Sequence, residues 1–155
     1  MIFPQRIVAI LVLLLSVNVV QAAGRLEVTN AWIPQAPPGA SAMAGYFDLK
    51  NTGDQPMGVV SVKSDRFGEV SLHQTVVEDG MARMRPLKDV VVEPGKTFTF
   101  APGGNHLMLM DPVSAVAPGE KIAIDIELSN GSMLHTDFEV RAAGEAAGDA
   151  HEHHH

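Results

Sequence analysis

The sequence predicts an all-β protein, an antiparallel β-sandwich of about eight or nine short strands. Apolar and polar side chains alternate with a period of two in most segments, and turns containing glycine or proline recur about every eight to twelve residues. No sustained helical period follows the apolar run near the N-terminus. Because each strand has one apolar side to bury, two sheets are expected to pack face to face.

Nine segments between clusters of turn residues are the expected strands. They cover residues 25–33, 42–51, 57–62, 67–77, 81–87, 96–100, 106–110, 121–128 and 133–141, with residues 90–92 as a link into the next turn. Two dipeptides, Asp79-Gly80 and Asn130-Gly131, each predict the two-residue loop of a tight hairpin.

Residues 1–22 have the layout of a secretory signal peptide. Arg6 precedes an apolar run over residues 7–20, and small residues predict cleavage after Ala22 or Ala23. A membrane anchor is the alternative, but fourteen apolar residues are short for a bilayer span. No cysteine follows the run, so a lipoprotein anchor is excluded. We expect an exported, periplasmic protein without a stable membrane anchor, and we expect a monomer.

Residues 23–141 are expected to form one β-sandwich domain, since a chain of 155 residues with 46% hydrophobic residues can fill one core. Cleavage would leave ten basic and eighteen acidic residues, a net charge of −8, which argues against nucleic acid as a partner. The absence of cysteine excludes thiol-disulfide exchange, zinc-thiolate sites and blue-copper electron transfer.

Two imidazoles and two thioethers between residues 73 and 108 suggest a soft-metal site. These residues are His73, Met84, His106 and Met108. If Asp79 and Gly80 form a two-residue loop, the paired positions sum to 159, and Met84 becomes the diagonal neighbour of His73 on the same face. A three-residue loop would instead turn Met84 to the opposite face.

His106 and Met108 are one residue apart in a strand, so they share a face while Leu107 and Leu109 point into the core. Met110 has the same parity and is either an additional ligand or only a cover. Thioethers select Cu(I), whereas Zn, Mg and Ca prefer thiolates, imidazoles or carboxylates. Because an imidazole must be neutral to bind a metal, the affinity should fall below about pH 6.5.

Residues 142–155 are rich in alanine, glycine and acids, and they are expected to form a flexible tail. The tail ends in four histidines, His151, His153, His154 and His155. An engineered tag is one interpretation. The other is a secondary site for Cu(II), which imidazoles on a mobile chain favour over Cu(I).

The spacing of the four candidate ligands resembles a family signature: a histidine, ten residues, a methionine, twenty-one residues, and then His-x-Met. This is the signature of the PCuAC family of periplasmic copper chaperones, and both spacings are intact here. The surrounding residues also match: Ala31-Trp32, Pro37-Pro38-Gly39, Ala44-Gly45-Tyr46, Asn51, Glu78-Asp79-Gly80-Met81 and Met84-Arg85-Pro86. Many family members have a methionine where this chain has Gln74. The resemblance covers about residues 25–141.

The resemblance implies a cupredoxin-like sandwich, of the immunoglobulin-like kind, that binds one Cu(I) near its surface. It also implies delivery to the CuA centre in the copper subunit of cytochrome c oxidase, alongside Sco-type proteins. The chain would carry the metal and would not be an enzyme. Copper sequestration by the same site is the alternative. A copper oxidoreductase and a metal-free adhesive sandwich are further, weaker interpretations.

Overall fold

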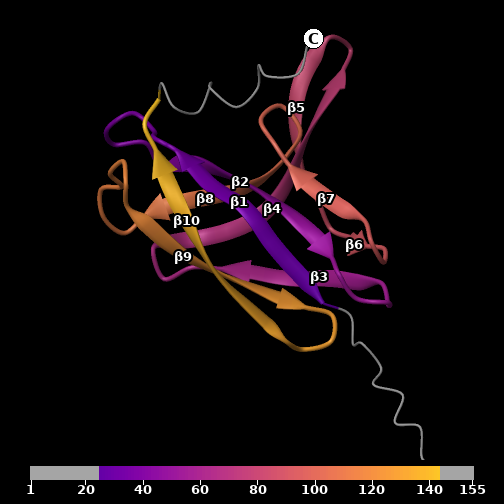
Figure 1. Cartoon of the computed structure of the whole chain (residues 1–155). Helices are drawn as coiled ribbons and strands as arrows, with labels where there is room; N and C mark the ends of the chain where they lie inside the picture. Colours follow the sequence, from indigo (N-terminus) through magenta and orange to yellow (C-terminus); the bar gives the residue numbers. More distant parts are fainter. Residues whose placement is uncertain (1–24, 144–155) are drawn as a thin grey trace, which may run out of the picture.

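The computed structural model describes residues 25–143, and within them the chain forms ten strands and no helix (Figure 1). The strands are β1 (Leu26–Pro34), β2 (Ala42–Asn51), β3 (Met57–Lys63), β4 (Phe67–Glu78), β5 (Met81–Pro86), β6 (Val90–Val92), β7 (Thr97–Phe100), β8 (Asn105–Pro112), β9 (Lys121–Leu128) and β10 (Met133–Arg141). The predicted all-β class is confirmed. The number of strands is ten rather than eight or nine, because residues 90–92 pair with β3 as a strand of their own.

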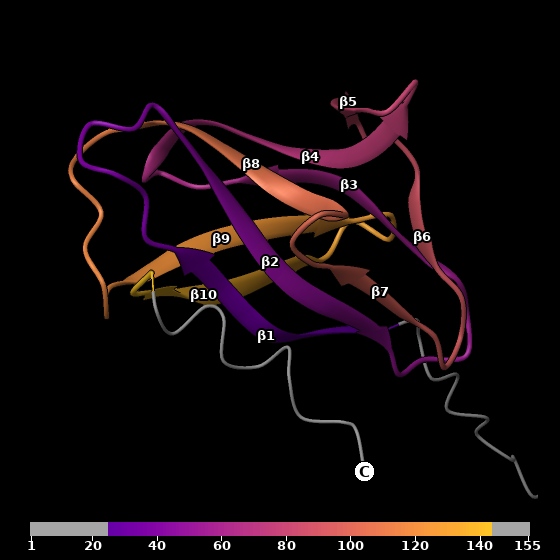
Figure 2. The same cartoon turned by 90° about the horizontal axis from the view of Figure 1, so that it is seen from above.

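The strands are hydrogen-bonded in the order β5-β4-β8-β2-β1-β10-β9-β3-β6, and β7 pairs with β2. The start of β2 pairs with β8, and its later residues pair with β7, so this strand takes part in both sheets. Figure 2 shows β4 and β8 on one side of the molecule and β9 and β10 on the other. Most pairs are antiparallel, but β1 and β10 are parallel. The alternation of apolar residues predicts a buried face without predicting the direction of the neighbouring strand.

The core lies between the two sheets and is built from one parity of each strand. β8 contributes Leu107 and Leu109, which are both 0% exposed, and β9 faces them with a run of buried isoleucines. Three phenylalanines pack together in the same layer: Phe47 stacks on Phe100 and meets Phe138 edge to face. Each buried leucine, isoleucine or phenylalanine stabilises the fold by about 1.5–3 kcal/mol. Because the odd positions of β8 are held in the core, its even positions must face outward.

The two predicted hairpin loops differ in the structure. Glu78 pairs with Met81, so Asp79 and Gly80 form a two-residue loop, and both have the positive φ of a type I′ turn (53° and 75°). This prediction is confirmed. In the β9–β10 hairpin, Met133 pairs with Glu127, which leaves three residues between Leu128 and Ser132. The prediction of a two-residue loop at Asn130-Gly131 is therefore wrong.

The predicted signal peptide, residues 1–22, lies outside the described residues, as do the four histidines at the end of the chain. Between residues 25 and 143, no helix is long and apolar enough to cross a membrane.

Candidate metal centre

Three neighbouring strands, β5, β4 and β8, carry the four candidate ligands on one face. His73 lies directly opposite His106 in the antiparallel pair of β4 and β8, and their ring centroids are 6.1 Å apart. Met108 lies two residues from His106 on β8 and opposite Ser71. Because side chains alternate with a period of two, all three candidate ligands point away from the Leu107 side of the sheet.

Met84 joins this face through the β4–β5 hairpin. It pairs with Thr75, two residues beyond His73, so it is the diagonal neighbour of His73 at about 7–8 Å by ordinary sheet geometry. β5 is an end of the strand order, and all six of its residues are exposed. Met84 itself is 61% exposed. The structure therefore brings the four predicted residues to one outer face, with Met84 at its open edge.

His106 is the most firmly held of the four side chains. It is only 6% exposed, and its Nδ1 lies 3.1 Å from the carbonyl oxygen of Gly104. A carbonyl can only accept, so Nδ1 carries the proton and Nε2 keeps a free lone pair in the neutral ring. The same Gly104 carbonyl also accepts the backbone N–H of Thr75 on β4. An imidazole that donates through one nitrogen to a backbone carbonyl is oriented to bind a metal through the other.

In His73 the two ring nitrogens have the opposite roles: Nε2 has a polar neighbour and Nδ1 does not. Its Nε2 lies 3.3 Å from the Ser71 hydroxyl, while its Nδ1 is buried and has no hydrogen-bond partner. Burial lowers the pKa of His73 below its ordinary value, and the neighbouring His106 lowers that pKa further, against the raising effect of Glu69. Burial and the neighbouring His106 therefore favour the neutral form of the ring. A neutral imidazole with an unpaired nitrogen on this face fits a metal ligand.

Sequence reasoning missed two residues that share the face. Ser71 contacts His73 and lies opposite Met108, and Glu69 lies opposite Met110. Both have the parity of His73 on β4, and that shared parity was the signal that could have found them. The remaining described histidine, His135, is bonded to Asp125 on β9 and lies away from this face.

The chemistry of this face is that of soft ligands. Within residues 25–143, no group of three or more histidine, cysteine, aspartate or glutamate side chains is positioned to hold a metal ion. Two imidazoles with two neutral thioethers suit Cu(I) better than Zn, Mg or Ca. The four side chains come from three strands, so folding alone brings them together.

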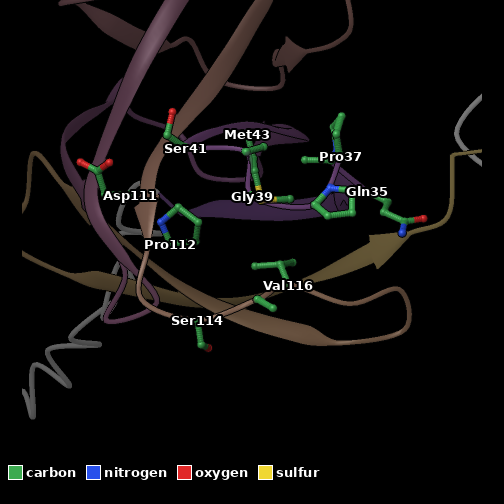
Figure 3. Close-up of a pocket in the computed structure, with 13 residues that line it drawn as sticks. Gln35, Pro37, Gly39, Ser41, Met43, Asp111, Pro112, Ser114 and Val116 are labelled. Atoms are coloured by element: carbon green, nitrogen blue, oxygen red, sulfur yellow. The ribbon is translucent and has the colours of Figure 1, made fainter.

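A separate cleft of about 600 Å³ lies at the other end of β8 (Figure 3). The segments 35–41 and 111–116 line it, with Met43 on its wall. Figure 3 shows Pro37, Pro112 and Val116 around this cleft. None of the four candidate ligands is among the residues that line it.

A family model described as "Putative lipoprotein LpqE-like" matches residues 26–140, which is most of the chain. The chain belongs to the LpqE-like family. "Putative lipoprotein Lxx21020" of Leifsonia xyli subsp. xyli is 37% identical over 113 residues, which are 72% of this chain and 66% of that protein. "Uncharacterized protein RP573" of Rickettsia prowazekii is 32% identical over 85 residues, 54% of this chain and 47% of that protein. This family member thus spans about half to two thirds of the length of the curated relatives it matches.

Solved structures also match this LpqE-like chain. The copper-bound PCuAC domain from PmoF2 has a TM-score of 0.64 at 22% identity, covering 77% of this chain and 94% of that domain. The solution structure of CuI-DR1885 from Deinococcus radiodurans has a TM-score of 0.59 at 27% identity, covering 72% of this chain and 74% of that one. These matches confirm the predicted cupredoxin-like sandwich and the resemblance to the PCuAC family.

Proposed function

We propose that this protein is a periplasmic copper chaperone that binds one Cu(I) through His73, Met84, His106 and Met108. The observation that carries the proposal is the cross-strand pair of His73 and His106, with both methionines on the same outer face. Each imidazole leaves one nitrogen available to a metal. In His106 this nitrogen is Nε2, because Nδ1 donates to the Gly104 carbonyl, and in His73 it is the buried Nδ1, which has no hydrogen-bond partner. The likeness to copper-bound PCuAC and CuI-DR1885 structures supports the choice of metal.

All four proposed ligands are neutral, so a bound Cu(I) would keep about its single positive charge. Thioethers bind weakly enough to exchange, which suits a carrier better than a permanent cofactor. Delivery to the CuA centre in the copper subunit of cytochrome c oxidase, with a Sco-type protein alongside, is the proposed destination. Because the sequence has no cysteine, the chaperone would carry the ion without reducing the thiols of its acceptor.

Cu(I) titration against a competing chelator tests the site. We expect one high-affinity Cu(I) in the wild type. In His73→Ala and Met108→Ala, the affinity should fall by more than the roughly 10–100-fold that loss of an outer-shell partner costs. His135→Ala is the matched control, because that histidine is bonded to Asp125 on the other sheet and should leave the affinity unchanged. Unchanged affinity in both site variants would end the proposal.

The destination requires a separate experiment in cells. A strain lacking this protein should lose cytochrome c oxidase activity at limiting copper and regain it with the wild type but not with His73→Ala. Loss of growth only at excess copper, with normal oxidase activity, would instead indicate sequestration by the same site.

A further inference from the structure

A third methionine lies on the metal-binding face of β8. Met110 follows Met108 by two residues, and the core residue Leu109 lies between them, so both sulfur-bearing side chains point outward. Their Cβ atoms are about 7 Å apart at the rise of an antiparallel strand. Methionine has three rotatable bonds beyond its backbone, so two such side chains can reach toward a common point between them.

The residues opposite Met110 on the two neighbouring strands favour the binding of a cation beside it. Glu69 of β4 lies opposite it on one side, and Ala42 of β2 lies opposite it on the other. Glu69 is exposed, and its carboxylate acts electrostatically on the His73 ring, so its negative charge extends over this part of the face. Ala42 is small and also exposed, so β2 puts no bulky side chain opposite Met110.

Core filling does not account for Met110. The methionines that fill the core are almost inaccessible: Met43 is 7% exposed and Met57 is 4% exposed. Met57 also accepts the Ser129 hydroxyl through its sulfur. Met110, by contrast, lies half-buried on the outer face, beyond the layer of Leu107 and Leu109. By strand parity its side chain lies on the face of the sheet that carries the proposed Cu(I) site.

We propose that Met110 is a transfer ligand, which binds Cu(I) together with Met108 when one of the primary ligands dissociates from the ion. This inference rests on the proposed Cu(I) site and extends it along β8. Met84 is the ligand to be replaced, because it is exposed on the end strand β5, whereas His106 is anchored by Gly104. The exchange breaks one copper–sulfur bond and forms another. The ion stays Cu(I), and no proton or electron moves. Glu69 supplies a counter-charge at the new position.

The test is a double-mutant comparison with methionines labelled by ¹³C at the methyl group. Met110→Leu in the wild-type background removes the sulfur at nearly constant volume and should leave Cu(I) affinity within about twofold. In the Met84→Leu background the same change should cost a further tenfold or so, because the replacement ligand is then in use. The Met110 methyl signal should shift on Cu(I) addition in Met84→Leu. Met81→Leu is the matched control, since Met81 is 55% exposed on the opposite face of the hairpin.

Two failures are distinguishable. If the Met84 and Met108 methyl signals do not move when Cu(I) is added to the wild type, the proposed Cu(I) site itself is wrong. If those signals move but the Met110 signal in Met84→Leu stays at its metal-free position, the Cu(I) site stands and the transfer role of Met110 is overturned. Equal costs of Met110→Leu and Met81→Leu in the Met84→Leu background would also overturn it.

Discussion

At the scale of single residues, the two histidines of the face differ in the hydrogen bonds that hold their rings. The Gly104 carbonyl orients His106 through Nδ1 and ties it to β4 through Thr75, so this ring is positioned before any metal arrives. The Nε2 of His73 lies within hydrogen-bond distance of the Ser71 hydroxyl, and its buried Nδ1 has no hydrogen-bond partner. An unpaired buried polar atom costs about 1–3 kcal/mol, and a metal bond would remove that cost. Copper binding should therefore order the His73 ring more than the His106 ring.

The pH dependence of binding follows from the neutral state of the imidazoles. Protons compete with Cu(I) for the same lone pairs, so affinity is lost as pH falls through the pKa of metal-free His73. Burial and the neighbouring His106 lower the pKa of His73, so protons compete at His73 only below the ordinary value of about 6.5. We expect Cu(I) affinity to stay constant from about pH 7.5 to 6.5 and to fall toward pH 5.

Chelator competition at each pH measures this profile, and Glu69→Gln refines it. The Glu69 carboxylate raises the pKa of His73, so removing its charge should lower that pKa and move the loss of affinity to lower pH. An affinity that remains flat down to pH 5 in the wild type would exclude histidine as a ligand.

At the scale of elements, the β4–β5 hairpin decides whether Met84 reaches the face at all. The tight turn at Asp79-Gly80 sets a register in which Met84 shares a face with His73, and a shift by one residue would turn it away. β5 has no partner on its outer side among the described strands, so its register depends on this turn and on the β4 ladder. On the opposite face of the hairpin, Glu78 pairs with Arg83 and Arg85, which leaves the metal face without these charges.

Gly80→Val tests the role of the turn. Gly80 has a φ of 75°, and a β-branched side chain there should destabilise the fold by about 1–2 kcal/mol or force a different loop. We expect lower thermal stability together with a loss of Cu(I) affinity, because a changed register removes Met84 from the face. Thermal unfolding and chelator competition measure the two effects.

Gly131→Val is the matched control for this prediction. Gly131 has a φ of 80° in the β9–β10 loop, so the backbone strain is similar, but no candidate ligand lies on that hairpin. This variant should lose stability and keep its Cu(I) affinity. If Gly80→Val binds Cu(I) as tightly as Gly131→Val does, the turn does not control the site.

These two hairpins also show how far local sequence predicts structure. Asp79-Gly80 formed the expected two-residue loop, whereas Asn130-Gly131 became part of a three-residue loop closed by the Leu128–Ser132 bond. In the loop that contains Asn130 only Gly131 has positive φ, whereas in the other loop both Asp79 and Gly80 do. The dipeptide permits more than one loop, and strand packing on either side selects between them. Parity within a strand was predictable, because it depends on alternation alone.

At the scale of the whole molecule, the site depends on pairings that alternation does not encode. The match of spacings predicts four candidate ligands, but the position of His73 opposite His106 depends on β4 pairing with β8, about thirty residues further along the chain. The parallel contact of β1 with β10 and the double role of β2 are likewise set by packing of the whole core. Alternation alone puts Glu69 and Ser71 on the face of His73, but their positions opposite Met110 and Met108 follow only from the pairing of β4 with β8.

The C-terminal histidines allow a prediction at this scale, because they are separate in sequence from every proposed Cu(I) ligand. His151, His153, His154 and His155 lie beyond the described residues, whereas the candidate ligands all fall between residues 73 and 108. Imidazoles without thioethers favour Cu(II) over Cu(I). Truncation after Arg141 should therefore abolish Cu(II) binding, measured by electron paramagnetic resonance, and leave Cu(I) affinity in chelator competition unchanged. Loss of both would mean that the tail supports the Cu(I) site, and retention of Cu(II) would place that ion elsewhere in the chain.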